Sequence, residues 1–554
     1  MRLTLERKIL GSNLPLAVMA SMISTMVTFV NILLIGTWMT DEDLAAATSS
    51  SMIGVILTVF CSVLATGGSI MFSRRLSSAY GEKASNSYTV VMILAVIFGA
   101  AFLIGCAIVS YLVGLAPGSD LAGYMSGAYI MALGVSGIPM LLLSISIMFL
   151  RIDNDRPLSI LCFIVFVASD VLLIHFTNEM YGELMWVGLS VAFASLIALA
   201  LVPLHLRVKE RKMRFVRPGA VMNEMKALLS IGTRTVINRI CSVVRYSFLN
   251  AFAVAIGAGV LCLASQSMVM HFVVALFSGC AIMINILSGL YYSQGDRTAV
   301  KASVREAAHL GILISLAITV FILIMAWPIT ALIAAGSGYE ESATWCLVWY
   351  SLSFPTSTVC MILIYTYQAT KRKPFSIVLT ILRGVAFMMA VVGLSEPYLG
   401  ISAVWISFLA SDLLMILTAV IAAWVYNRRF PRDLDDLLML EGRPKFEEPS
   451  VFEGAIYSKR EELDNLLGTL SSCLSGSGMD DDSKDKITGR VEELVGKIID
   501  EGYDDGREHP IEILVRKDGN VIVRDEAPRT FDLPGIRHST SIGMNTYFIS
   551  PSAS

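Results

Sequence analysis

Twelve long apolar stretches constrain this chain more than any other feature. A helix needs about 20 consecutive, mostly apolar residues to cross the hydrocarbon core of a bilayer. Of the 554 residues, 55% are hydrophobic and only 16% are charged, which excludes a soluble fold for most of the chain. We expect membrane-spanning helices near residues 14–38, 44–72, 88–115, 123–150, 158–177, 184–205, 228–255, 260–291, 310–335, 342–370, 376–394 and 401–426.

The loops between these stretches carry their charges asymmetrically. Every loop on one side contains Lys or Arg, for example Arg74, Arg151 and Arg372, whereas the loops on the other side contain acidic residues and no Lys or Arg. Positively charged loops remain on the cytoplasmic side of a membrane. We therefore expect a multi-pass protein of a plasma membrane of the bacterial cytoplasmic type, with an even number of spans and both termini in the cytoplasm.

Two short matches relate the halves of the chain. Gly81–Lys83, after the second stretch, corresponds to Gly295–Arg297 after the eighth, and Arg156–Ile160 corresponds to Lys373–Ile377 after the tenth. The offsets are 214 and 217 residues, and each pair occupies the same topological position. An even number of spans in each unit makes the repeat parallel, with an axis along the membrane normal. The expected fold is an α-helical polytopic membrane protein with two six-helix lobes, residues 1–216 and 217–427.

Three groups of segments carry a family resemblance: Asn31–Gly36 with Leu44–Ala47, then Gly67–Ala84, then Arg151–Pro157. Over roughly residues 8–428 they resemble the multidrug and toxic compound extrusion (MATE) family, part of a larger group that includes lipid-linked oligosaccharide flippases. The resemblance implies a secondary transporter that exports small organic substrates, driven by a sodium or proton gradient. The family's first-span carboxylate falls at Asn31, which cannot exchange a proton, and Asp170 is a candidate for supplying the missing charge.

Polar side chains at mid-membrane depth cost a few kcal/mol or more and are candidates for function. The candidates for substrate or ion binding are Asn31, Asp170, Arg239, Arg245, Gln266, Arg383 and Asp412. Arginines outnumber acids in this set, which favours an anionic substrate. The alternative is that Asp170 and Asp412 only neutralise two arginines inside the protein, since ion pairs are common wherever charges enter membranes. The sequence leaves both interpretations open.

The composition changes abruptly after the last stretch. Residues 428–454 have the composition of a linker, with Pro431, Pro444 and Pro449. A helical pattern from Ile456 to about Leu474 and a second one over 481–502 precede alternating strands near 511–515 and 521–523. This order predicts a small α/β sandwich domain over residues 455–554, called the tail below.

The tail resembles the histidine-kinase-type ATPase fold of anti-sigma-factor kinases in Val491–Leu494, Val521–Asp525 and Gly543–Asn545. The resemblance assigns the nucleotide-binding positions to Glu493, Lys497 and Asp525. Lys497 stands where the family has its magnesium-chelating Asn, and neither glycine of the family's loop follows Asp525. Glycine is needed there for close approach of the backbone to a nucleotide. We expect an inactive ATPase-like domain that regulates or binds a partner, and nucleotide binding stays open.

Several classes of protein are excluded or disfavoured. The chain has no GxxxxGK[ST] loop, which excludes a P-loop pump, and its nine cysteines lack the spacing of a zinc site. We expect no metal, no cofactor, no catalytic residue and no nucleic-acid partner. The expected partners are the lipid bilayer, a small-molecule substrate and a regulatory protein at the tail. A flippase of a lipid-linked or anionic substrate, and a membrane sensor that signals through the tail, are the alternatives.

Overall fold

The computed structural model describes most of the apolar stretches and the tail, and every statement below concerns the described residues. They are residues 5–12, 14, 31, 34–35, 38–40, 43, 46–47, 50–76, 81–114, 121–153, 155–207, 213–219, 221–228, 236–237, 240–241, 244–245, 248, 252, 279, 281, 283–333, 340–440, 450–475, 481–516, 519–541 and 543–550. Much of the first, seventh and eighth expected spans lies outside them.

The helices of the first lobe follow the expected stretches. They are α3 (Ser51–Leu76), α4 (Gly81–Gly114), α5 (Leu121–Ile152), α6 (Arg156–Met180) and α7 (Leu184–Leu199), followed by a 3-10 helix, Val202–Arg207. The hydrocarbon core of a bilayer offers no water to the backbone, and an α-helix satisfies its own backbone N–H and C=O groups. The apolar stretches therefore form α-helices. The start of α6 is set by Pro157 in the first turn and by Asp155, which accepts a hydrogen bond from the backbone N of Leu158 at 3.4 Å.

The second lobe contains α10 (Arg297–Ile333), α11 (Glu340–Ser351), α12 (Phe354–Ala369), α13 (Lys373–Ile381), α14 (Phe387–Leu399) and α15 (Ser402–Asn427). The sequence predicts one span where α11 and α12 occur, and the two helices meet at a bend of 42°. A π-helical turn, Leu382–Ala386, joins α13 to α14. Such turns are rare and are frequent at functional sites.

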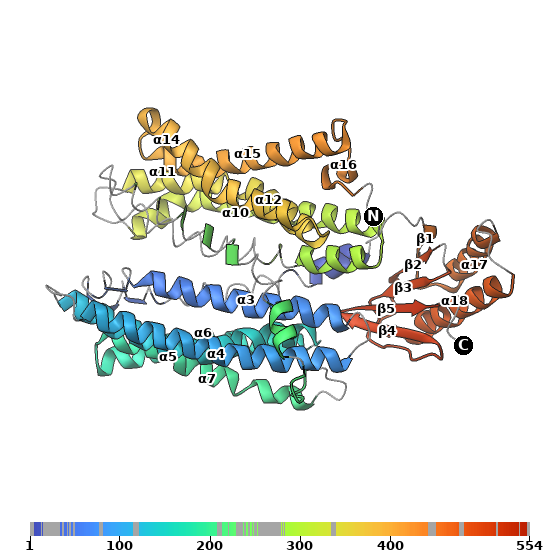
Figure 1. Cartoon of the computed structure of the whole chain (residues 1–554), viewed down its shortest axis with the longest axis horizontal. Helices are drawn as coiled ribbons and strands as arrows, with labels where there is room; N and C mark the ends of the chain where they lie inside the picture. Colours follow the sequence, from blue (N-terminus) through green and yellow to red (C-terminus); the bar gives the residue numbers. More distant parts are fainter. Residues whose placement is uncertain are drawn as a thin grey trace.

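The described helices account for most of the expected spans. Seven are long and apolar enough to cross a membrane, or up to eight if the bent pair forms one span. The expected number of twelve stays a prediction, because the first, seventh and eighth spans fall largely on residues outside the described ranges and α3, in the second, is not among the helices counted. Figure 1 shows the two lobes as separate bundles lying side by side, α3–α7 in one and α10–α15 in the other, with the tail at one end. We call this end the tail end and the opposite one the far end.

Among the described residues, the large apolar core shared by the lobes lies toward the tail end, and a smaller cluster joins Leu14 to Ile314 and Ile318 of α10. One cluster of buried side chains contains Leu64 and Phe149 from the first lobe, Leu287 and Tyr367 from the second, and Met544 from the tail. At the far end each lobe has its own cluster, around Tyr129 in the first lobe and around Trp405 in the second. The described cores therefore join the lobes at the tail end and leave them separate at the far end.

The segments that flank the membrane helices attach to the second lobe. In the N-terminal helical segment, residues 5–12, Arg7 Nε lies 3.9 Å from the Glu306 carboxylate of α10. After α15, the short helix α16 (Leu434–Leu438) is held to α10 by Asp435, whose oxygens lie 2.9 Å from Arg297 Nε and 2.6 Å from Lys301 Nζ. The expected linker thus contains an anchored helix that ties the end of the last span to α10.

The tail is a two-layer α/β domain, as predicted. Its antiparallel sheet has the order β1-β2-β3-β5-β4, and α17 (Arg460–Ser475) and α18 (Asp481–Glu501) pack against one face. The strands are β1 (Ser450–Tyr457), β2 (Pro510–Arg516), β3 (Val521–Asp525), β4 (Ile536–Ser541) and β5 (Met544–Ile549). The core consists of Leu, Ile and Val side chains from both layers.

The first element of the tail differs from the expectation. The predicted helix start at Ile456 and the predicted boundary at residue 455 both fall inside β1, which pairs with β2 along its length. Ile456 is buried because it faces the core as a strand residue, and α17 begins only at Arg460. A strand whose partner follows more than fifty residues later has no local signal, so the sequence pattern attached Ile456 to the next helix.

The crossing of α4 and α5 gives a test of the packing. A methyl group on Gly99 would lie 2.6 Å from Ile138 Cγ1 and 2.8 Å from its Cα, whereas one on Gly105 of the same helix would meet nothing within 4 Å. We expect Gly99→Ala to lower the unfolding free energy by about 1–3 kcal/mol through overpacking. Thermal melting of the purified protein, followed by size-exclusion chromatography, measures this. The control Gly105→Ala should melt like the wild type, and equal melting of both variants would contradict the described crossing.

Candidate functional site

A buried polar cluster lies in the first lobe around Asp170 of α6. Asp170 is 2% exposed, and its Oδ1 accepts a hydrogen bond from the Ser190 hydroxyl of α7 at 2.8 Å. Tyr129 of α5 lies within electrostatic range of Asp170, and its hydroxyl hydrogen-bonds to the side chain of Asn31. Asn31 and Asp170, which lie on different spans, are thus linked through Tyr129. We call these four residues the first-lobe cluster.

The first-lobe cluster has the chemistry of a cation or proton site. It combines one carboxylate with an amide, a phenol and a hydroxyl, and all four groups can present oxygen atoms to a hard cation. The carboxylate can also take up a proton, which the amide of Asn31 cannot. The position of Asp170 therefore fits the expectation that it supplies the charge missing at Asn31.

A second buried polar cluster lies in the second lobe and is built around an ion pair. Arg383 Nε donates to Asp412 Oδ1 of α15 at 2.5 Å, and Ser357 of α12 donates to the other carboxylate oxygen. Arg383 lies in the π-helical turn, and Asp412 is 2% exposed. Of the two interpretations left open by the sequence, the internal ion pair describes Arg383 and Asp412 in this conformation.

Arg245 borders the same part of α15. Its guanidinium carbon lies 5.4 Å from the centroid of the Phe408 ring, and Phe408 precedes Asp412 by one helical turn. The Tyr350 ring packs edge-to-face on Phe408 at 4.8 Å, and Tyr350 lies within electrostatic range of Arg383. We call Arg245, Tyr350, Arg383 and Asp412, with Ser357, the second-lobe cluster. The other two candidates, Arg239 and Gln266, lie outside the described residues.

The three predicted nucleotide-binding positions of the tail have different surroundings, and their role in nucleotide binding stays a prediction. Glu493 and Lys497 pair with each other at 3.2 Å on α18, with side chains 54% and 41% exposed. Asp525, by contrast, is completely buried at the end of β3, where its Oδ1 accepts hydrogen bonds from the Ala527 backbone N at 2.6 Å and from Asn545 Nδ2 at 2.9 Å. Asp525 thus holds the loop after β3 in place. Among the described contacts, none joins it to α18.

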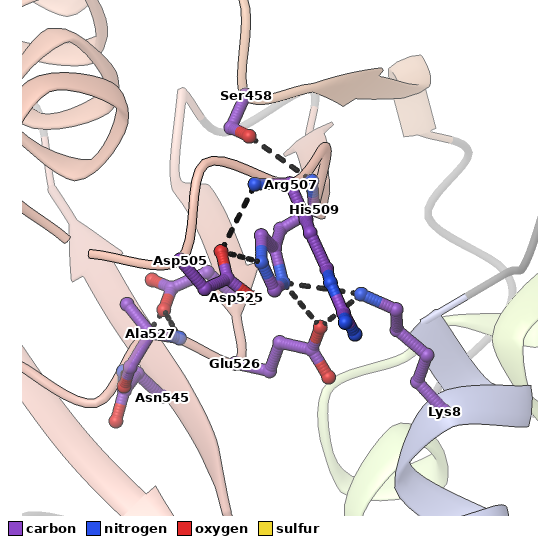
Figure 2. A network of polar contacts seen from close by, with 9 residues as sticks. All are labelled: Lys8, Ser458, Asp505, Arg507, His509, Asp525, Glu526, Ala527 and Asn545. Atoms are coloured by element: carbon purple, nitrogen blue, oxygen red, sulfur yellow. Dashed lines mark hydrogen bonds and ion pairs between the residues drawn. The ribbon is translucent and has the colours of Figure 1, made fainter. Parts of the chain in front are cut away.

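A junction between the tail and the membrane helices was not predicted. Lys8 Nζ lies 2.6 Å from Glu526 Oε1 and 3.1 Å from His509 Nδ1, as Figure 2 shows. His509 also lies 2.9 Å from Asp505 and stacks on Tyr503. The partners Lys8 and Glu526 are separated by 518 residues, so the sequence offers no signal that connects them.

Arg524 of β3 lies at the centre of this junction. It is 2% exposed, its Nη1 lies 2.7 Å from Asp296, and its Nε donates to Gln294 at 2.9 Å. Its guanidinium also lies 4.8 Å from the centroid of the Tyr291 ring. A charge inside the apolar strand Val521–Asp525 is a sequence signal that could have marked Arg524, because a buried guanidinium requires an acidic partner.

Metal ligation has no support from the described residues. Within the described ranges, no group of three or more His, Cys, Asp or Glu side chains could hold a metal ion. The oxygen atoms of the first-lobe cluster come mainly from neutral side chains, which suit a monovalent cation better than a resident transition metal.

Comparison of the fold with solved structures identifies its architecture. A MATE protein in complex with MaL6 matches with a TM-score of 0.67 and 17% identity, over 75% of this chain and 96% of that one. An outward-facing multidrug resistance MATE family transporter of the MOP superfamily matches with a TM-score of 0.67 and 17% identity, over 76% and 97% of the two chains. The chain has the fold of a MATE transporter.

A third neighbour with this fold is a MOP superfamily transporter from Pyrococcus furiosus, for which a reverse polarity of the binding pocket suggests a different function. It matches with a TM-score of 0.67 and 18% identity, over 76% of this chain and 97% of that one. No family model matches the sequence, and no curated protein matches it. The MATE fold is thus shared at low identity, and the likeness of the tail to histidine-kinase-type ATPases stays a prediction.

The buried carboxyl of Asp525 predicts a pH-dependent stability of the tail. Burial raises its pKa from 3.8 to about 7, against the effect of the hydrogen bonds from Ala527 and Asn545. An acid with a raised pKa binds its proton more tightly in the folded state, so the tail loses stability as the pH rises from about 4 to about 7. Asp525→Asn keeps Oδ1 as a hydrogen-bond acceptor but cannot ionise, so the variant should not lose stability as the pH rises. We expect the variant to be more stable than the wild type at pH 8, on the order of a few kcal/mol, and equal to it below pH 4.

Urea unfolding of residues 441–554, which contain a separate hydrophobic core, measures this difference. The control is Asp532→Asn, since the Asp532 side chain is 91% exposed. Lower stability of Asp525→Asn at every pH would contradict the raised pKa.

Proposed function

We propose that this protein is a secondary active transporter that exports small organic substrates by alternating access, driven by a sodium or proton gradient. The observation that carries the proposal is the first-lobe cluster, a buried carboxylate grouped with three other oxygen-bearing side chains in a MATE-type fold. An ionisable group at membrane depth is costly and is retained where it serves ion or substrate movement.

The arrangement of the lobes suits alternating access. Two bundles that share an apolar core at one end and have separate cores at the other can rock about a site between them. With the tail end in the cytoplasm, as the positively charged loops predict, the described conformation is closed to the cytoplasm. The opposite conformation then requires the shared core to separate.

The coupling ion acts, in this proposal, through Asp170. A proton would neutralise the carboxylate of Asp170 and weaken its hydrogen bond with the Ser190 hydroxyl. A sodium ion would instead be bound by the oxygens of Asp170, Asn31, Tyr129 and Ser190. Either event changes the charge of a buried group, so either can shift the balance between the two conformations. Sodium and proton coupling are distinguished by which imposed gradient drives efflux.

Substitution of Asp170 tests the coupling site. In proteoliposomes under an imposed sodium or pH gradient, we expect Asp170→Asn to reduce gradient-driven efflux at least tenfold, because the amide can neither be protonated nor supply a negative charge. The matched control is Glu179→Gln on the same helix, whose side chain is 64% exposed, and it should retain wild-type efflux. Undiminished gradient-driven efflux by Asp170→Asn would contradict the proposal. Absence of any such efflux in the wild type would favour the flippase or the sensor.

We further propose that the tail regulates transport by bracing the closed tail end. β4 packs against α3 of the first lobe, while Arg524 is buried against Asp296 at the start of α10 in the second lobe. Thr298 and Glu453 add a contact of 2.7 Å between α10 and β1. A rigid domain in contact with both lobes opposes their separation, so the docked tail stabilises the conformation closed to the cytoplasm.

A charge exchange at the junction tests this regulation. Lys8→Glu places two carboxylates next to each other, and Glu526→Lys places two ammonium groups next to each other. Each single variant should therefore weaken tail docking by about 1–2 kcal/mol, which is roughly 5- to 30-fold in the docking equilibrium constant. We expect both to raise the transport rate and to increase hydrogen exchange in β3, and the double variant to restore both properties. Increased exchange with an unchanged transport rate would contradict a regulatory tail.

A further inference from the structure

Two arginines of the second-lobe cluster occupy positions that the repeat relates to polar residues of the first-lobe cluster. Arg245 lies 214 residues after Asn31, and Arg383 lies 213 residues after Asp170, close to the offset of the loop motifs. In each lobe a tyrosine, Tyr129 or Tyr350, lies within electrostatic range of the charged residue on the fifth helix of that lobe. The two lobes therefore carry related clusters, one centred on a carboxylate and the other on a guanidinium.

Only one of the three nitrogens of the Arg383 guanidinium donates to a carboxylate among its described contacts. Asp412 engages Nε, while Nη2 donates to the Ser357 hydroxyl at 3.0 Å and Nη1 to the Met361 thioether sulfur at 3.5 Å. A thioether is a weak acceptor and a hydroxyl a neutral one. The edge formed by the two Nη groups is one of the two edges that can bind a carboxylate in bidentate fashion, and it faces no carboxylate among its described contacts.

Accessibility also differs between the partners of the pair. The Arg383 side chain is 12% exposed, whereas that of Asp412 is 2% exposed, so Arg383 is the less buried member of the pair. The Thr356 and Ser357 hydroxyls both donate to Oδ2 of Asp412, and the Cys360 thiol contacts the backbone oxygen of Asp412 at 3.4 Å. This arrangement fixes the carboxylate as an internal counter-ion and leaves the guanidinium to meet a ligand.

The backbone is specialised at the same position. Arg383 lies in the π-helical turn Leu382–Ala386, whereas α6 is an uninterrupted α-helix through Asp170. Gly384, next to Arg383, lies against Cys241 of the seventh span, where an added Cβ would be 3.0 Å from the Cys241 Cβ. The turn thus brings Arg383 close to the span that carries Arg245, four residues after Cys241.

We propose that the second-lobe cluster binds a small organic anion, with its carboxylate or sulfonate on the Nη edge of Arg383 and with Arg245 as a second cation. Asp412 acts as the resident counter-ion, which keeps Arg383 paired when the site is empty and competes electrostatically with the ligand. The inference rests on the proposed transport function, for which it names the substrate class, and it distinguishes the roles of the lobes. The first lobe carries the coupling cation and the second the anionic substrate.

Binding of 2-naphthoate and of its neutral analogue 2-naphthamide to the full chain in nanodiscs, measured by calorimetry, tests the site. We expect the wild type to bind the anion more tightly than the amide. Arg383→Gln should weaken binding of 2-naphthoate about tenfold, as expected for a lost charge-assisted contact. Asp412→Asn should strengthen it about fivefold or more, because the competing negative charge is removed. Neither variant should change binding of the amide by more than twofold.

A merely structural ion pair gives a different pattern. If Arg383→Gln and Asp412→Asn change 2-naphthoate binding in the same direction, or if the amide binds as tightly as the anion, the proposal is overturned. Because a single variant leaves a buried charge alone and can impair folding, the double variant Arg383→Gln with Asp412→Asn is included. It should fold and should bind 2-naphthoate no more tightly than Arg383→Gln alone. Tighter binding of 2-naphthoate by the double variant than by Arg383→Gln would show that Arg383 is not part of the anion site.

Two further variants separate this site from the coupling site. Asp170→Asn should lose gradient-driven efflux but still bind 2-naphthoate more tightly than 2-naphthamide, so failure of the coupling proposal and failure of the anion site give different results. Arg429→Gln removes an exposed arginine that pairs with Asp436 just after the last helix of the second lobe, and it should bind the anion like the wild type. A tenfold loss in Arg429→Gln would show that 2-naphthoate senses general charge and would overturn the assignment to Arg383.

Discussion

The interior of a bilayer contains no water, so every polar group placed there must find its partner within the chain. The backbone meets this requirement by forming the long helices of both lobes. The side chains meet it in two ways. Asp412 is surrounded by the guanidinium of Arg383 and by hydroxyls of α12, whereas Asp170 accepts from Ser190 and lies beside Tyr129. One carboxylate is held as an ion pair and the other by an uncharged donor, which suits the first for a fixed role and the second for ion exchange.

The same requirement explains why the shared apolar core matters. In lipid there is no hydrophobic force to drive helices together, so packing and polar contacts decide which lobes touch. The lobes are joined near the tail, where the core cluster also reaches Met544, and have separate cores at the far end. In the alternating access that we propose, one closed end is exchanged for the other. A domain attached at the closed end is therefore in a position to bias that exchange.

The residues that the resemblance assigns to nucleotide binding make structural contacts in the tail. Asp525 is enclosed by the loop after β3 and by Asn545, while Glu493 and Lys497 neutralise each other on the surface of α18. The adjacent Arg524 is buried at the junction with the membrane helices. Desolvation of such a guanidinium is tolerable only with an acid beside it, which Asp296 supplies across the junction and Glu512 within the tail. The junction thus ties the orientation of β3 to the start of α10.

Hydropathy and loop charge alone determined most of the helices of both lobes, because membrane thickness fixes the length of an apolar span. The internal repeat also lay in the sequence, as did the charged residues of both clusters and Asn31, whereas Tyr129, Ser190, Tyr350 and Ser357 were not predicted. Only tertiary structure decided that Arg383 pairs with Asp412, that Tyr129 connects Asn31 to Asp170, and that Ile456 belongs to a strand. These contacts join residues that are distant in the chain. The hydrophobic periodicity of a segment predicts which residues are buried but not which partner each residue contacts. For the same reason the junction of Lys8 with Glu526 was invisible in the sequence.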